Sequence, residues 1–391
     1  MDNERWLLPD GVEDLLPPQA KRVENVRRNL LDLFERWGYD YVIPPIVEYL
    51  ESLLTGTGKD LDLLTFKTVD LLSGRTMGIR ADITPQVARI DAHSLGKPGI
   101  QRLCYAGTTV RSNASSIFSS RTPISAGAEF FGDVSENADA EIVSLMIESL
   151  TIFGFSSIQL NLGNVEIFRR LIVGLGISLA DRDRIFQAVQ KKATNELREI
   201  CKEIGLPEEE SSIVQSLPDL CGNAEILTAA NKLFSSYPDI LESIESLEKL
   251  YSIISKRYSE IDIYFDLSEL RGFAYHTGVV FSANLKGNSD FIAKGGRYDH
   301  IGGVFGRDSR EATGFSIDVV NLSDLVPNEE KSKESVLVIP SPEGFGKGLW
   351  KKTEELRAKG YIVVESGDSE NYELLLRYEA GEWQMISGKK L

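Results

Sequence analysis

Apolar residues recur at three- and four-residue spacing in several stretches of the chain. The clearest run covers residues 17–37, where Pro17-Pro18 opens the segment and one stripe carries Val23, Val26, Leu30, Leu33, Phe34 and Trp37. Such a stripe predicts an amphipathic helix, and Gly38 provides its end. The same spacing predicts a helix over 138–153 that ends at Gly154, and a set of charged helices from about 165 to 260.

Other segments have the patterns of strands. Residues 65–69 and 77–80 flank a Ser73-Gly74 turn and predict a hairpin, while 158–162 and 261–267 alternate apolar and polar residues. Residues 104–106 and 128–131 predict two more strands around a serine-rich loop, 111–121, whose composition indicates mobility. Thr84-Pro85 is expected to start a helix with Thr84 as its N-cap, and 314–322 are expected to form a closing helix.

The grouping of these elements predicts the fold class. Strands and helices come in blocks with tight hairpins, which indicates an α+β protein with an antiparallel sheet and attached helices. No glycine-rich dinucleotide or P-loop motif follows a strand. We expect a core formed by residues 1–165 and 261–326, a helical insertion at 166–260, and a polar linker followed by a small C-terminal α/β domain at 327–391.

Composition narrows the class of protein. The chain has 391 residues and 42% hydrophobic residues, enough for two or three domains with a sizeable core. It lacks a signal-peptide pattern and a membrane-length apolar run, and its three cysteines are widely spaced with no zinc-like pairing, so we expect a cytoplasmic protein without a metal or other cofactor. The net charge of −16 makes nucleic acid and anionic membranes poor candidates as partners.

Several polar motifs stand out against this background. Arg80-Ala-Asp82-Ile-Thr84 precedes a predicted helix, Arg111 follows a predicted strand, and Glu129 lies within an apolar strand. Further on come Arg271-Gly-Phe-Ala-Tyr275-His276 and Gly295-Gly-Arg297-Tyr298-Asp299. A carboxylate such as Glu129 among apolar residues needs a partner, so these motifs indicate a binding site.

In combination, over roughly residues 5–325, the motifs resemble those of histidyl-tRNA synthetase, a class II aminoacyl-tRNA synthetase. The resemblance implies a site for free histidine: Asp82 and Thr84 at the amino group, Arg271 at the carboxylate, and Glu129 and Tyr275 at the two ring nitrogens. It also identifies Arg111 as the arginine of the second class II motif and Tyr298 as a wall of the pocket. An arginine guanidinium that binds the carboxylate through two hydrogen bonds, together with hydrogen bonds to both ring nitrogens, would make such a site selective for histidine.

The ATP-binding motifs depart from this pattern. Asn113 stands where the second motif has a glutamate, and Asp318-Val-Val-Asn321 replaces the Gly-Leu-Glu-Arg whose arginine clamps ATP. Since adenylation depends on cations placed around the triphosphate, we expect no aminoacyl-adenylate.

The combination of motifs resembles the synthetase-like regulatory subunits of ATP phosphoribosyltransferase, which pair with a short catalytic subunit in the first step of histidine biosynthesis. Arg271-Gly-Phe-Ala-Tyr-His-Thr-Gly278, Leu8-Pro-Asp-Gly-Val-Glu-Asp-Leu15 and the short C-terminal part fit that group. The resemblance implies a non-catalytic, histidine-binding subunit of a hetero-oligomer, which itself dimerises through the first helix and the Pro44-Pro45 region. A divergent histidyl-tRNA synthetase and a tRNA-sensing regulator are the alternatives.

Structural roles also account for single residues. Asp82 suits a helix start, and Tyr275 and Tyr298 suit strands. His276 and His300 suit hydrogen-bonded structural positions, and His93 suits a helix surface. The glycines near 295–306 suit turns, above all Gly302-Gly303. The helical insertion suits packing or the docking of a partner.

Overall fold

The computed structural model describes residues 6–56, 59–113, 120–288, 290–304, 310–327, 335–341, 348–367 and 372–387. The chain divides into two compact units, 1–326 and 327–391. Most of the expected serine-rich loop, Gly306 and nearly all of the expected linker lie outside the described residues.

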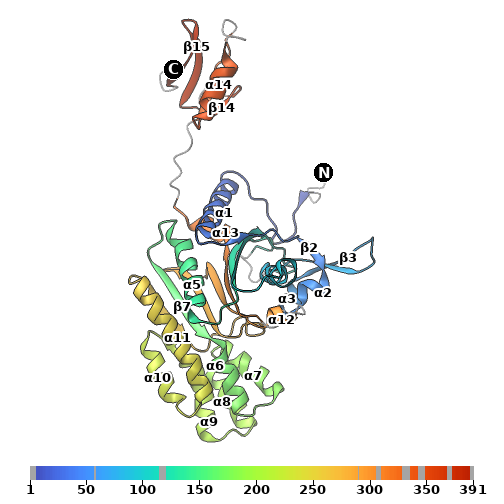
Figure 1. Ribbon diagram of the computed structural model, residues 1–391, viewed down its shortest axis with the longest axis vertical. Helices are drawn as coiled ribbons and strands as arrows, with labels where there is room; N and C mark the ends of the chain where they lie inside the picture. Colours follow the sequence, from blue (N-terminus) through green and yellow to red (C-terminus); the bar gives the residue numbers. More distant parts are fainter. Residues whose placement is uncertain are drawn as a thin grey trace. The chain divides into compact units, whose positions relative to one another are not determined.

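A nine-stranded sheet forms the centre of the first unit (Figure 1). Its strand order is β1-β5-β6-β12-β11-β10-β7-β9-β8. The strands are β1 Asp40–Tyr41, β5 Gln101–Thr108, β6 Ile124–Phe131, β12 Ala312–Asp318, β11 Ala293–Arg297, β10 Val279–Leu285, β7 Ile158–Asn164, β9 Asp262–Asp266 and β8 Cys221–Gly222. Neighbours are antiparallel except in the pairs β1/β5 and β7/β9. The expected α+β class is therefore confirmed, with a sheet that is mostly rather than wholly antiparallel.

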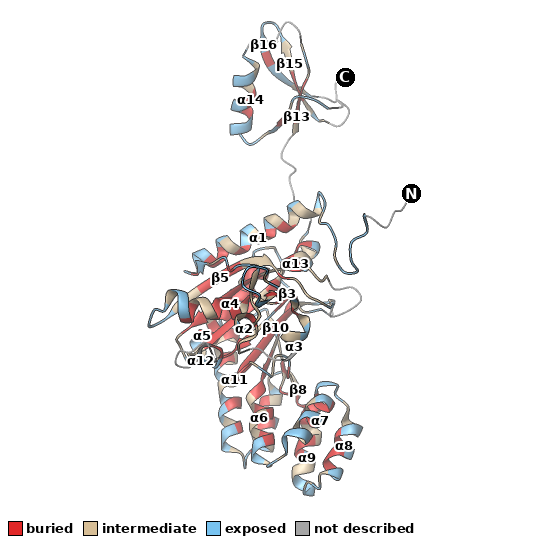
Figure 2. Ribbon diagram, turned by 90° about the vertical axis from the view of Figure 1, so that its right-hand side faces the viewer, coloured by how far each residue is buried: buried red, intermediate tan, exposed pale blue. Residues whose placement is uncertain are grey.

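The sheet packs into one large hydrophobic core with α1 Gln19–Arg36, α5 Glu136–Thr151 and α13 Val319–Leu325, and the same core extends into the helices of residues 165–257. The predicted stripe of α1 is buried, except that Trp37 follows the helix and is only partly buried. In Figure 2 the buried residues gather along the central strands and the helices against them. Burial of this face, rather than helix propensity alone, stabilises α1.

A small sheet and short helices precede β5. β2 Val47–Tyr49 and β3 Phe66–Val69 both pair with β4 Thr76–Ile79, as expected for the 65–80 hairpin. The short helices are α2 Leu50–Leu54 and α3 Lys59–Leu64. α4, Thr84–Arg89, continues into a π-helix at Ile90–Leu95. The expected N-cap at Thr84 was wrong: Thr84 is already helical, and its amide donates to the Asp82 carboxylate at 3.0 Å.

Residues 165–257 form a succession of helices, as the spacing predicted. They are α6 Val165–Gly174, α7 Leu179–Gln190, α8 Thr194–Glu203, α9 Glu208–Ser216, a 3-10 turn at Leu217–Asp219, α10 Glu225–Leu233 and α11 Pro238–Arg257. Asn164 and Ser178 accept amide hydrogen bonds at the starts of α6 and α7. The short β8 joins this region to the edge of the large sheet.

Two expectations near the end of the unit were wrong. Residues 312–318 form β12, and only 319–325 are helical, because Phe315 and Ile317 alternate with the small residues Gly314 and Ser316. Gly295 and Gly296 lie inside β11, and Gly302-Gly303 lie in the short helix α12, Ile301–Val304, rather than in turns.

The second unit is a small α/β sheet. Its order is β14-β13-β15-β16, with β13 Ser335–Val338 parallel to β14 Ile362–Val364 and to β15 Leu374–Glu379. α14, Leu349–Ala358, packs its buried Leu356 into the core of this unit. β16, Glu382–Ser387, pairs antiparallel with β15 and was not anticipated.

Candidate functional site

A cavity of about 600 Å³ opens on one face of the large sheet. Its walls come from β7, β10, β11 and β12, from residues 82–85, and from the segment 266–276 that links β9 to β10. A recess of about 40 Å³ shares several of these wall residues and is also lined by Glu129 and Tyr298. The structure thus brings together all seven residues proposed from the sequence: Asp82, Thr84, Arg111, Arg271 and Tyr275 line the cavity, and Glu129 and Tyr298 line the recess.

Glu129 is the buried acid of the recess. It is 1% exposed, and its partner in the strand register is Gly314 of β12. A Cβ atom at Gly314 would lie 1.6 Å from Glu129 Oε2, so only glycine leaves room for this carboxyl group. The strand that the sequence failed to predict therefore supplies the space in which Glu129 sits.

Two hydroxyl groups donate to Glu129. Thr84 Oγ1 lies 2.8 Å from one carboxyl oxygen and Tyr298 Oη 2.5 Å from the other. Burial nevertheless raises the pKa of Glu129 to about 8, and these hydrogen bonds offset only part of that shift. A carboxyl group in this state can exchange a proton with an imidazole ring near neutral pH.

Tyrosine side chains surround this acid. Tyr298 is 1% exposed, and its ring meets Phe131 edge to face at 6.4 Å between centroids. Tyr275 stacks on His276 with 4.1 Å between ring centroids, and burial raises its pKa well above 10. Both tyrosines are therefore neutral donors at physiological pH, suited to ring nitrogens or carboxyl oxygens.

Asp82 and Arg271 line the cavity with opposite charges. One oxygen of Asp82 caps the start of α4, so the structural role weighed for it coexists with a place in the cavity wall. The Arg271 guanidinium contacts the Glu269 carboxylate through Nε, at 2.9 and 3.0 Å, and through Nη2, and lies 4.0 Å from the centroid of the Phe291 ring. Several hydrogen-bond donors of the Arg271 guanidinium are thus already used by Glu269.

Two further cations belong to the cavity. Arg111 lines it, and its buried Nε has no hydrogen-bond partner among the described atoms. Lys294, in β11, lines both the cavity and the recess. Lys294 was not expected to line a site, because the glycines beside it suit a turn; alternation of residues 293–297 between the two faces of a strand would have predicted its place on a sheet face.

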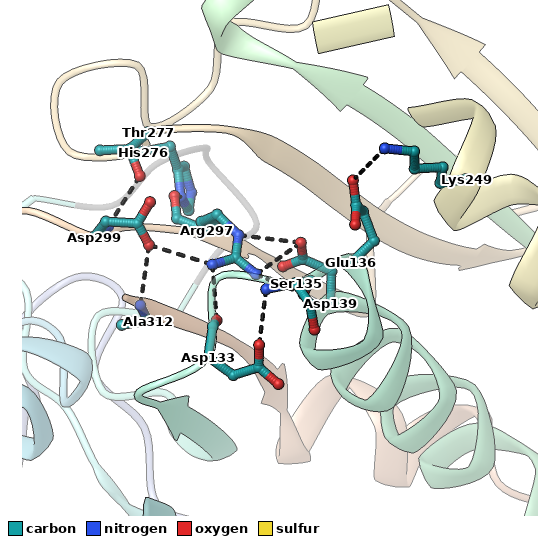
Figure 3. A network of polar contacts seen from close by, with 10 residues as sticks. All are labelled: Asp133, Ser135, Glu136, Asp139, Lys249, His276, Thr277, Arg297, Asp299 and Ala312. Atoms are coloured by element: carbon teal, nitrogen blue, oxygen red, sulfur yellow. Dashed lines mark hydrogen bonds and ion pairs between the residues drawn. The ribbon is translucent and has the colours of Figure 1, made fainter. Parts of the chain in front are cut away.

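A buried polar network includes His276, which also lines the cavity (Figure 3). Arg297 donates to Asp139 of α5 at 2.9 and 3.1 Å, and to the carbonyl oxygens of Asp133 and Ser135. The Nδ1 atom of His276 lies 3.1 Å from the Arg297 carbonyl oxygen, which makes Nδ1 the protonated nitrogen. Burial lowers the pKa of His276 to about 4. The structural role expected for His276 is therefore confirmed.

Asp318 and Asn321 occupy the place of the third class II motif. Asp318 caps α13 by accepting the amides of Val320 and Asn321 at 3.0 and 3.1 Å. The Asn321 side-chain amide donates to the same carboxylate at 3.2 Å. An uncharged amide thus takes part in a helix cap where the synthetase motif has its arginine. Among the described residues, no cluster of three or more histidine, cysteine or acidic side chains could hold a metal ion.

Sequence relatives identify the family. A regulatory subunit of ATP phosphoribosyltransferase from Ectopseudomonas mendocina is 44% identical over 98% of both chains. The corresponding subunit of Stutzerimonas stutzeri is 46% identical over 95% of this chain and 93% of the relative. This chain belongs to the family of ATP phosphoribosyltransferase regulatory subunits. The family profile of histidyl-tRNA synthetase matches residues 11–322 of this chain, close to the span expected from the motifs.

Solved structures agree with this assignment. A protein of Bacillus halodurans described as an ATP phosphoribosyltransferase regulatory subunit/histidyl-tRNA synthetase superimposes with a TM-score of 0.85 and 25% identity, covering 96% of this chain and 99% of the other. Histidyl-tRNA synthetase from a Nostoc species has a TM-score of 0.78 over 98% of this chain and 97% of its own, at 16% identity, and so supports the fold alone. As a member of the regulatory-subunit family, this chain thus has a class II synthetase-like core. Among its described residues, no helix is long and apolar enough to cross a bilayer.

Proposed function

We propose that this chain is a non-catalytic subunit that senses free histidine and conveys its concentration to a short-form ATP phosphoribosyltransferase catalytic subunit. The single observation that carries the proposal is the contrast between the cavity and the third class II motif. Residues suited to an amino acid converge in the cavity, whereas the motif position of the ATP-clamping arginine holds Asn321, an amide engaged in the cap of α13.

The cavity offers a partner for each part of histidine. Asp82 retains a second carboxylate oxygen for the amino group, and Arg271, Arg111 and Lys294 supply positive charge for the carboxylate. Glu129 and Tyr275 are suited to the ring nitrogens, and Thr84 and Tyr298 hold Glu129 in place. A site that satisfies every polar group of its ligand rejects analogues that lack one.

Inhibition follows if histidine binds one state of the assembly more tightly than another. A coupling free energy of about 1–3 kcal/mol would change affinity by roughly 5- to 150-fold. We propose that the subunit also pairs with itself through α1 and the Pro44-Pro45 region. The exposed side chains of Tyr41, Ile43 and Ile46 support this surface, since they are 44%, 77% and 47% exposed.

The proposal is tested by assembling the chain with a short-form catalytic subunit and measuring ATP phosphoribosyltransferase activity with increasing histidine. We expect histidine to inhibit the assembly and to leave the isolated catalytic subunit unaffected. Asp82→Asn keeps the oxygen that caps α4 but removes the charge that would face the ligand amine, so it should raise the inhibitory concentration at least tenfold. Asp262→Asn, on an exposed strand start outside the cavity, serves as the matched control.

Two results would contradict the proposal. One is an assembly whose activity does not respond to histidine although the chain is folded and bound. The other is histidine-dependent exchange of pyrophosphate into ATP by the isolated chain, which would favour a divergent synthetase. Retention of tRNA at low salt would favour the tRNA-sensing alternative.

A further inference from the structure

Lys294 occupies an unusual position for a lysine. It lies in β11, in the middle of the nine-stranded sheet, where a charged side chain normally requires a partner. Its neighbours in the strand register are Ser282 of β10 and Ser316 of β12. All three residues line the cavity, so two small hydroxyl side chains flank the lysine and leave its side chain exposed to the cavity.

The side chain of Lys294 makes no hydrogen bond or ion pair with the described residues, although Arg111 and Arg271 place further positive charge nearby. Asp82 and Asp318 contribute opposing charge but lie beyond ion-pair distance. Desolvation by the cavity walls and the two guanidinium groups lower the pKa of Lys294. A cation in this setting gains most from an anion that arrives with the ligand.

Arg271 is less available for that anion. Glu269 neutralises its charge through a multiply bonded contact, and the Phe291 ring covers it. For Arg271 to bind a ligand carboxylate, its contact with Glu269 must weaken, which costs part of the free energy gained. Lys294 has no such contact to give up.

The geometry of the sheet relates Lys294 to Glu129. Glu129 lies in β6 and Lys294 in β11, with β12 between them. Glu129 pairs with Gly314 of β12, and Gly314 pairs with Gly296 of β11, which is two residues after Lys294. With strands ~4.8 Å apart and a rise of ~3.3 Å per residue, the Cα atoms are roughly 12 Å apart. A ligand with a ring at one end and a carboxylate at the other fits between the two side chains.

We infer that Lys294 binds the carboxylate of the amino acid and makes the site discriminate histidine from analogues that lack this charge. The inference rests on the proposed histidine site and adds its specificity-determining cation. Histidinamide, in which an uncharged amide replaces the carboxylate, is the probe that isolates this contact.

The test is calorimetric titration of the wild type, Lys294→Met and Lys294→Arg with L-histidine and with L-histidinamide. We expect the wild type to prefer histidine, and Lys294→Met to weaken histidine binding 10- to 100-fold while changing histidinamide affinity less than threefold. Lys294→Arg should restore part of the preference. Lys286→Met, the same change at an exposed lysine outside the cavity, should leave both affinities unchanged.

The outcomes separate the two proposals. If the wild type binds histidine and Lys294→Met weakens both ligands equally, or neither, the role of Lys294 is wrong while the histidine site stands. If the folded wild type does not bind histidine, the proposed function fails and this inference fails with it.

Discussion

Replacing Glu129 with glutamine removes a buried ionisable group and keeps the shape of the side chain. The wild-type carboxyl group is 1% exposed, and burial raises its pKa from 4.5 to about 8. The folded protein therefore holds this proton more tightly than the unfolded chain does. Stability contributed by the protonated group is fully present below pH 4.5 and is lost as the pH rises through about 8.

The size of the effect follows from the shift. Each pKa unit corresponds to ~1.36 kcal/mol, so the full loss is about 5 kcal/mol, of which about 4 kcal/mol falls between pH 5 and pH 8.5. Glutamine cannot ionise, but it gives up one of the two oxygens that accept from Thr84 and Tyr298. That lost hydrogen bond costs about 1 kcal/mol at any pH. Glu129→Gln should thus be slightly less stable than wild type at pH 5 and about 3 kcal/mol more stable at pH 8.5.

The assay is urea unfolding followed by circular dichroism at pH 5 and pH 8.5. The difference between the two proteins isolates Glu129, because His276 and all other titrating groups are common to both. Glu208→Gln, at an exposed position in the first turn of α9, should retain the wild-type dependence on pH. If the free energies of unfolding of wild type and Glu129→Gln change in parallel with pH, the carboxyl group is not held protonated by burial and the reasoning is refuted. Glu129→Gln should also lose most of its histidine affinity, so at pH 8.5 this variant should be more stable than the wild type but bind histidine more weakly.

Three further changes can be measured in the same way. Asp139→Asn leaves a buried arginine without its main charge partner and should cost about 3–5 kcal/mol. Lys249→Met, which breaks more exposed ion pairs with Glu136 of the same helix and with Glu245, should cost less than about 1 kcal/mol; equal costs would contradict this account. Gly314→Ala should cost about 3 kcal/mol or more, because its Cβ atom would collide with a carboxyl oxygen of Glu129. Gly174→Ala, whose Cβ atom would have no neighbour closer than 3.9 Å, should change stability by less than about 1 kcal/mol. An unchanged stability of Gly314→Ala would refute the close packing of Gly314 against Glu129. The buried His276 must gain a proton in acid, so the wild type should lose about 2 kcal/mol relative to His276→Phe between pH 6.5 and pH 4.5, since the contribution of Glu129 is common to both proteins; a difference between the two proteins that does not change with pH would be the contrary result.

Local patterns in the chain predicted the elements whose signal lies in neighbouring residues. The stripe from Val23 to Phe34 depends only on helical spacing, and it is buried as expected. Glu129 could be singled out as a buried acid because the residues on either side of it are apolar or small. The resemblance of the motifs, rather than their chemistry alone, gave each side chain its expected role.

Patterns failed where the partner of a residue is distant in the chain. Gly295, Gly296 and Gly314 looked like turn or helix residues, but each lies in a strand whose neighbours approach too closely for a side chain. Lys294 was overlooked for the same reason, since its position on the cavity face depends on pairing with β10 and β12.

By itself, the sequence determined that this chain has an α+β core with a helical region, keeps residues suited to an amino acid, and lacks a basic arginine at the ATP clamp. Those features depend on residue type and on spacing along the chain. Only the tertiary structure decided that burial raises the pKa of Glu129 to about 8, that Arg271 is already engaged by Glu269, and that the Lys294 side chain lines the cavity. Burial and charge pairing depend on which distant strands meet, and local sequence patterns do not specify that.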